Sequence, residues 1–124
     1  MNKLNYKYSF ERLNVWQEAR RFVTRIYKIT QNFPDVEKFG LTNQIRRASV
    51  SIPANIAEGT SRNSKKDQAH FTNISYGSLM EVLSHLYISL DLNFITQEDF
   101  NTLKIKIYDL SNQINALHKS QLNR

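Results

Sequence analysis

The sequence has no cysteine among its 124 residues, which excludes a disulfide scaffold, a cysteine zinc site, an iron–sulfur centre and a cysteine nucleophile. Three glycines and two prolines are too few for a turn-rich β-sandwich or barrel. No apolar run approaches the roughly 18 residues that a membrane span needs, and the N-terminus shows no apolar signal-peptide core. These absences predict a soluble, cytoplasmic protein with a single domain over residues 1–124.

Basic side chains outnumber acidic ones by 17 to 11, for a formal net charge of +6. The excess lies early in the sequence, because residues 1–66 hold 13 basic and 5 acidic side chains, whereas residues 67–124 hold 4 and 6. Such concentrated positive charge favours binding to a polyanion. The alternative is that lysine and arginine only solubilise exposed helix faces, so charge alone does not name a function.

Apolar residues recur at helical spacing in four segments, and no stretch alternates like a β-strand. Asn14, Ser64 and Thr96 are predicted N-caps, and Pro53 predicts a kink or local break inside the second helix. Four helices with short connections predict an all-α fold, an antiparallel up-down-up-down four-helix bundle. The predicted helices span about residues 14–33, 36–59, 65–93 and 97–121.

The third predicted helix carries apolar side chains nearly all round its axis. A small domain has no room to bury such a helix on every face, so we expect part of it to lie in a contact between subunits. Trp16, on the apolar face of the first helix, is expected in the core or in a subunit contact.

Two groups of basic residues are the candidate nucleic-acid-binding residues. One group forms a row along the first helix, on the side opposite its apolar face, and the other lies in the turn between the second and third helices. We expect both to contact the phosphates of RNA or DNA with little sequence specificity. Most aromatic residues lie on core faces, except Tyr6 and Tyr8 in a basic N-terminal segment. The candidate residues are Arg21, Arg25, Lys28, Arg62, Lys65 and Lys66.

A polar stripe follows one flank of the second helix, beside its apolar face. Arg47 within it would form an ion pair with Glu81 of the third helix or with Glu58. Three interpretations are open: a structural polar network, a surface for RNA or a small ligand, and a metal or catalytic site. We favour the structural network, whose members are Gln44, Arg47, Ser51, Asn55, Glu58, Ser78 and Glu81.

No catalytic or metal-binding arrangement stands out. The three glycines lie far apart, so there is no glycine-rich phosphate loop. A di-iron bundle needs two Glu-x-x-His pairs, and none of the three histidines has that context. We therefore predict a protein that is not an enzyme and that has no cofactor and no metal site.

The segment QIRRASVSIPANIAEG, residues 44–59, is long and specific. It resembles the signature of the four-helix-bundle proteins named after the 23S rRNA intervening sequence. Residues 13–19, residues 33–41 and the Gly77–Glu81 element agree with this resemblance, which covers about residues 10–95 in order. Tyr76 departs from it, because an arginine is expected before Gly77. Any anion binding that relatives owe to this arginine is therefore not expected of this chain.

The resemblance implies an antiparallel bundle that assembles into a ring-like homopentamer around a central channel. Founding members of the family are encoded inside insertions in large-subunit ribosomal RNA genes. The related accessory variability proteins of diversity-generating retroelements share the pentameric bundle, bind nucleic acid through basic surface and work with a reverse transcriptase. By this analogy we expect a homo-oligomer that binds RNA or DNA. The alternative is a structural or adaptor oligomer whose partner is another protein.

Overall fold

The computed structural model describes residues 2–123. Within them the chain forms four long α-helices and no strand, which confirms the predicted all-α class. Three short 3-10 helices, η1 (Lys3–Asn5), η2 (Ser9–Arg12) and η3 (Asp35–Glu37), lie before α1 and between α1 and α2. The long helices are α1 (Asn14–Thr30), α2 (Leu41–Thr60), α3 (Lys65–Asp91) and α4 (Gln97–Leu122).

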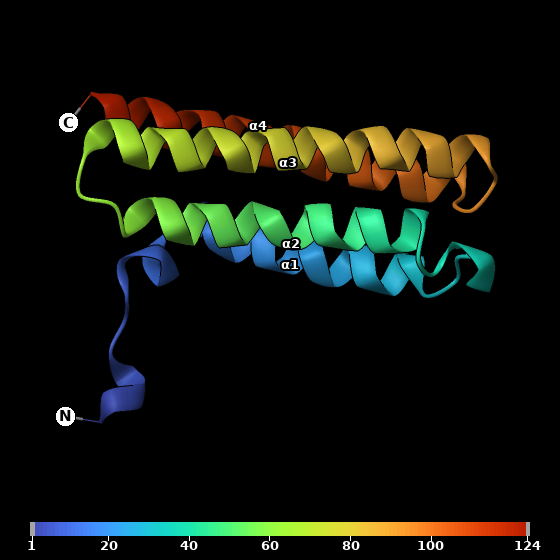
Figure 1. The fold of residues 1–124 in the computed structure, drawn as a ribbon, viewed down its shortest axis with the longest axis horizontal. Helices are drawn as coiled ribbons and strands as arrows, with labels where there is room; N and C mark the ends of the chain where they lie inside the picture. The colour runs from blue at the N-terminus through green and yellow to red at the C-terminus, as the bar shows by residue number, and fades with distance from the viewer. Residues whose placement is uncertain (1, 124) are drawn as a thin grey trace.

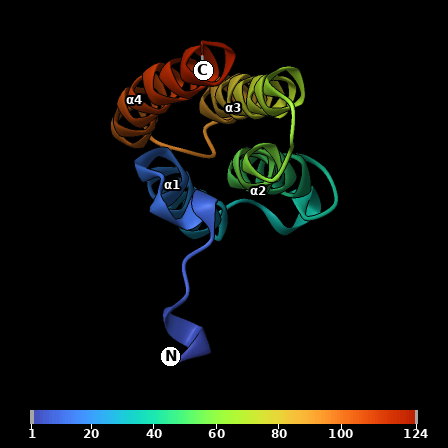
Figure 2. The same cartoon turned by 90° about the vertical axis from the view of Figure 1, so that its left-hand side faces the viewer.

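The four helices lie side by side along the long axis of the molecule (Figure 1). Seen from one end, they follow one another around a common core in the order α1, α2, α3, α4 (Figure 2). The packing around this ring is uneven, since α2 and α3 have the most extensive contact and α1 and α4 the least. The seam between α1 and α4 is therefore the loosest of the four.

The core is built from the apolar faces that the sequence predicts. Side chains from all four long helices are buried, among them Ile26 of α1, Ile45 of α2, Leu79 of α3 and Leu103 of α4. Burying a side chain of this size contributes about 1.5–3 kcal/mol each. The spacing of apolar residues, three and four positions apart, thus determines which face of each helix packs into the core.

The helix starts agree with the sequence at two of three positions. Ser64 and Thr96 cap α3 and α4, because each hydroxyl accepts a hydrogen bond of 3.0 Å from the backbone N–H three residues later. The prediction for Asn14 is wrong, since it is the first residue of α1 and Leu13 is the N-cap. The Asn14 side chain instead donates to Gln113 Oε1 of α4 at 3.3 Å.

Two helix boundaries and the proline also differ from expectation. α1 ends at Thr30 rather than near residue 33, and α2 begins at Leu41 rather than at 36, because η3 forms separately between them. The residue before a proline avoids the helical region, and Phe33 precedes Pro34. The break expected at Pro53 is absent, since α2 runs through it uninterrupted. Next to this proline, Ser75 of α3 donates its hydroxyl to the Ile52 carbonyl at 2.9 Å.

Some apolar residues remain accessible. Trp16 is half-buried and packs against the core, with the ring of Phe10 at 4.9 Å. α3 exposes Ile74, Tyr87 and Ile88. None of the described helices combines the length and the apolar character needed to cross a membrane.

Candidate nucleic-acid interface

The six predicted basic residues occupy two separate places. Arg21, Arg25 and Lys28 lie on the side of α1 that faces α4. Arg62, Lys65 and Lys66 lie at the connection between α2 and α3. The order of the helices places the α1–α4 seam and the α2–α3 connection on opposite sides of the bundle (Figure 2). The two groups therefore form two basic sites rather than one patch.

The α1 group lines a groove. The loose packing of α1 against α4 leaves a hollow of about 890 Å³, which Lys106 of α4 also lines. A second hollow continues from it toward the α3–α4 connection, because Lys28, Ile29 and Asp99 line both. The row expected on the open surface of α1 is thus the wall of an extended groove.

Charges within this groove are mixed. Arg21 is exposed but already forms an ion pair with Glu18 at 2.9 Å. Asp99 and Asp109 also line the groove and reduce its positive potential. Arg25 differs from its neighbours, since its Nε is enclosed and has no hydrogen-bond acceptor among the described residues. An enclosed guanidinium N–H without a partner costs stability, and because this atom has almost no exposed surface it is itself closed to an external phosphate.

The group at the α2–α3 connection is more open. Arg62 lies over the Phe71 ring at 4.5 Å and pairs with Glu58 at 3.5 Å, which holds its guanidinium in place. Lys65 and Lys66 are exposed at the start of α3 and form no ion pair within residues 2–123. A helix N-terminus attracts anions, and two free ammonium groups there reinforce that attraction.

The net charge is concentrated in one half of the bundle. When each long helix is divided near its midpoint, the half with the α2–α3 connection holds nine basic and four acidic side chains of the described chain. The other half holds seven of each sign. The first half comprises residues 2–21, 51–77 and 110–123. Each half of the bundle contains residues from both the early and the late part of the sequence. The excess of positive charge is therefore distributed along the bundle axis, with more of it in the half that holds the α2–α3 connection.

The polar stripe of α2 is a structural network only in its middle. Ser51 and Ser78 share a hydrogen bond of 2.8 Å between α2 and α3, and Asn55 donates to the Ser51 hydroxyl at 2.8 Å. Gln44 is exposed at one end of the stripe. The network interpretation thus applies to the two serines and the asparagine, at the closest helix pair.

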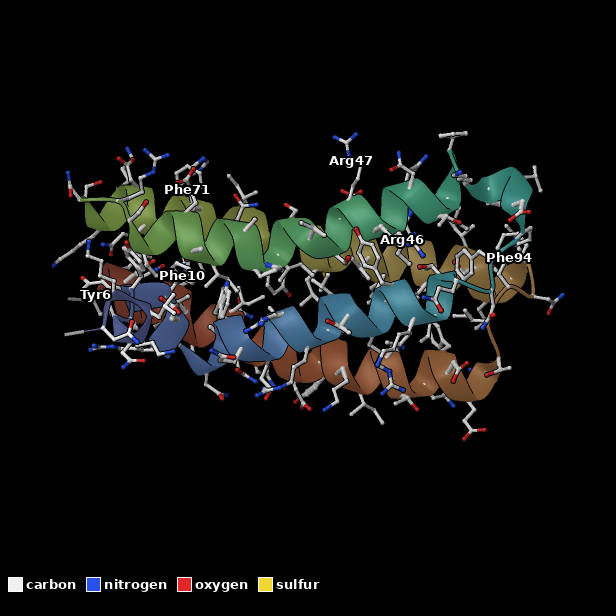
Figure 3. The ribbon with its side chains drawn as sticks, turned by 90° about the horizontal axis from the view of Figure 1, so that it is seen from below. Tyr6, Phe10, Arg46, Arg47, Phe71 and Phe94 are labelled. Atoms are coloured by element: carbon white, nitrogen blue, oxygen red, sulfur yellow. The ribbon has the colours of Figure 1, made fainter. Side chains whose placement is uncertain are left out.

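The ion pair predicted for Arg47 is wrong. Glu58 pairs with Arg62, and Glu81 contacts His85 Nε2 at 3.2 Å. Arg47 is exposed and points away from the bundle (Figure 3). Its position on the outer edge of the stripe directs the side chain to solvent rather than to α3.

Sequence reasoning missed the role of Arg46. Its guanidinium lies between α2 and α1 (Figure 3), donates to Thr30 Oγ1 at 2.8 Å and to the Tyr27 carbonyl at 3.3 Å, and stacks on the Tyr27 ring at 4.6 Å. It satisfies a carbonyl in the last turn of α1, where a positive charge is favourable. The available signal was its position next to Ile45, at the edge of the apolar face of α2.

No metal centre is found in the described part of the chain, where no three His, Cys, Asp or Glu side chains cluster closely enough to hold an ion. Glu81 and His85 provide only two such groups.

Comparisons with known proteins agree with the fold. The model of the family described as 23S rRNA-intervening sequence protein matches residues 11–116. A crystal structure from Bacteroides thetaiotaomicron, described as a protein of unknown function from the S23 ribosomal protein family, is similar with a TM-score of 0.78. It shares 24% sequence identity, and the match covers 85% of this chain and 95% of that one. The comparison with curated proteins gives no match.

Proposed function

The chain belongs to the 23S rRNA-intervening sequence protein family, and on that premise we propose that it binds RNA or DNA through phosphate contacts, with little sequence specificity. In this proposal the protein is cytoplasmic, is not an enzyme and needs neither a cofactor nor a metal. Its two basic sites are the α1–α4 groove, with Arg21, Arg25 and Lys28 in its wall, and the α2–α3 connection.

The uneven charge along the bundle axis is the observation that carries this proposal. An excess of five positive charges in one half, against balance in the other, creates a potential that orients a polyanion toward one end. In the described part of the chain, Lys65 and Lys66 have no carboxylate partner to neutralise them. Contacts of this kind read phosphates rather than bases, which accounts for the low expected sequence specificity.

We propose further that the antiparallel up-down-up-down bundle assembles into a ring-like homo-oligomer, a pentamer by resemblance to the family and to the accessory variability proteins. Ile74, Tyr87 and Ile88 support this, because they are apolar side chains that α3 leaves accessible. Repeating a modest basic site around a ring raises the effective concentration of each further contact. A monomer mass by light scattering at micromolar concentration would contradict the assembly.

The test is a titration of fluorescent structured RNA and of duplex DNA with the purified protein across a salt series. Affinity should fall as salt is added, so that log Kd rises linearly with log salt, because each phosphate contact releases counterions. Absence of binding even at about 50 mM salt would overturn the proposal.

A second candidate function is a structural or adaptor protein that binds another protein. Val36 and Phe39, in the α1–α2 connection, favour it, since both are large apolar side chains more than 80% exposed. The α1–α2 connection lies at the end of the bundle without excess charge (Figure 1). Under this alternative, charge-neutralising substitutions leave partner binding intact and no polyanion binds at physiological salt.

A further inference from the structure

The N-terminal segment projects from the bundle as an arm. Residues 2–8 extend away from the four long helices in both views (Figures 1 and 2). Among the described elements, η2 packs against α1 and α2, whereas η1 contacts no other element. We call residues 2–8 the arm and Ser9–Arg12 its root.

The root is firmly attached to the bundle. Glu11 joins it to the arm, because its carboxylate accepts a hydrogen bond of 2.9 Å from the backbone N–H of Tyr8. Gln17 of α1 donates to the Glu11 carbonyl at 3.0 Å, and Phe10 packs edge-on against Trp16. The arm therefore leaves the bundle at a defined point and in a defined direction.

Two aromatic rings on this arm have no place in the core. Tyr6 and Tyr8 contact each other edge-to-face with 5.0 Å between ring centroids, and both are more than half exposed. Their backbone is extended, and the contact between the two rings places them on the same side of the arm. Lys3 and Lys7 add positive charge, and among residues 2–123 only Lys7 of the two has a carboxylate nearby, Glu11 at 4.0 Å.

We propose that the arm binds single-stranded nucleic acid, with Tyr6 and Tyr8 stacking on unpaired bases and Lys3 and Lys7 contacting the adjacent phosphates. This inference rests on the proposed function and names the form of nucleic acid involved. Exposed aromatic rings interleaved with cations are the chemistry by which proteins bind single strands. A duplex hides the faces of its bases and offers these rings nothing to stack on.

The spacing of the rings suits this role. Two residues of extended chain separate their attachment points by about 6.6 Å, roughly twice the 3.4 Å step between stacked bases. Two rings so attached can enclose one base or stack on successive bases once they turn out of the edge-to-face contact that they make with each other. Tyr6 also lies at the same end of the bundle as Phe71, the ring under Arg62 (Figure 3). A strand held by the arm therefore starts from the half with excess positive charge.

The experiment uses the full chain with three probes: oligouridine, oligodeoxythymidine of the same length, and a duplex. The test variant is Tyr6→Leu/Tyr8→Leu, and Tyr6→Phe/Tyr8→Phe keeps the rings but removes the hydroxyls. Tyr108→Leu is the matched control, because Tyr108 is equally exposed but lies on α4 in the other half. None of these positions is in the core, so folding is unaffected.

The leucine pair should bind both single strands about tenfold more weakly, while the duplex affinity and the salt slope stay unchanged. The phenylalanine pair and the control should bind like the unmodified protein. The inference is overturned if the leucine pair binds single strands normally, if it loses the duplex equally, if the loss is confined to one sugar, or if the phenylalanine pair fails with it. A change in light-scattering mass in the leucine pair would also overturn it, since the arm would then be a contact between subunits.

The result separates this inference from the proposed function. Salt-dependent binding of duplex with no effect of the leucine pair refutes the role of the arm alone. Absence of binding to any of the three probes refutes both.

Discussion

Arg46 of α2 donates a hydrogen bond of 2.8 Å from its Nε to the Thr30 hydroxyl, the last residue of α1. The Thr30 hydroxyl in turn donates to the Ile26 carbonyl at 2.8 Å. The guanidinium therefore holds the end of one helix from the side of the next. Its neighbour Arg47, adjacent in sequence, points to solvent and has no ion pair in the described chain.

These two arginines provide a matched pair of substitutions. Arg46→Ala should lower the free energy of unfolding by about 1–3 kcal/mol, because it removes two charge-assisted hydrogen bonds and the stacking on Tyr27. Arg47→Ala should change it by less than about 0.5 kcal/mol, as exposed unpaired side chains do. Urea unfolding of both variants measures the difference. Equal losses would mean that the contact to α1 contributes no stability.

Two glycines should respond to alanine with opposite signs. A Cβ at Gly59 would lie 3.1 Å from the Gln68 carbonyl and 3.3 Å from Phe71 Cβ, so α2 approaches α3 closely at this glycine. Gly59→Ala should therefore destabilise the protein by about 1–3 kcal/mol. A Cβ at Gly77 meets nothing within 4 Å, so Gly77→Ala should stabilise α3 by about 0.5–1 kcal/mol. Thermal unfolding of the two variants shows the signs, and a stabilising Gly59→Ala would contradict the close approach.

A buried hydrogen bond joins α4 to α3 near the end of the described chain. Thr72 donates its hydroxyl to Gln121 Oε1 at 2.6 Å, and both side chains are fully buried. Thr72→Val should cost about 1–3 kcal/mol, because it leaves the Gln121 amide oxygen without a donor, beside an amide nitrogen that has no partner within residues 2–123. The double variant Thr72→Val/Gln121→Leu should recover part of that loss. A double-mutant cycle in urea checks this, and strict additivity of the two changes would contradict it.

A substitution of Arg25 should affect nucleic-acid binding without lowering the stability of the fold. Its enclosed Nε lacks an acceptor among the described residues, so Arg25→Met should leave the unfolding free energy unchanged or raise it slightly. The same change should make the slope of log affinity against log salt shallower by about 1, which is the contribution of one phosphate contact. Urea unfolding and the salt-series titration measure the two effects. A stability loss above about 1 kcal/mol would show that Arg25 has an acceptor in the free protein. An unchanged slope would exclude the groove from the interface.

The sequence was sufficient for the fold class and for most of the core. Apolar spacing is imposed by the helix itself, so the buried positions of α2 and α4 could be predicted without tertiary information. The caps at Ser64 and Thr96 could be predicted for the same reason, since they are local. The role of Asn14 could not be predicted, because its side chain donates a hydrogen bond to Gln113, almost one hundred residues later in the sequence.

The site was less predictable because it depends on how the helices pack. The row that begins at Arg21 could be recognised from spacing, but not that it would line a groove, because that follows from the loose seam between α1 and α4. The partners of Arg46 and Arg47 differ for the same reason. Adjacent residues on a helix point about 100° apart, and the position of α1 determines that Arg46 forms the hydrogen bond to Thr30. The concentration of charge in one half also appears only once the helices are folded back on one another.

The most direct test of the central claim compares two triple variants of equal net charge by the titration of structured RNA across a salt series. Arg62→Gln/Lys65→Gln/Lys66→Gln removes three cations from the positive half, and Lys38→Gln/Arg47→Gln/Lys104→Gln removes three from the other half. The account predicts that the first variant binds more weakly and lowers the salt slope by about 2–3, while the second keeps the slope of the unmodified protein. Equal slopes for the two variants would contradict binding through the positive half of the bundle.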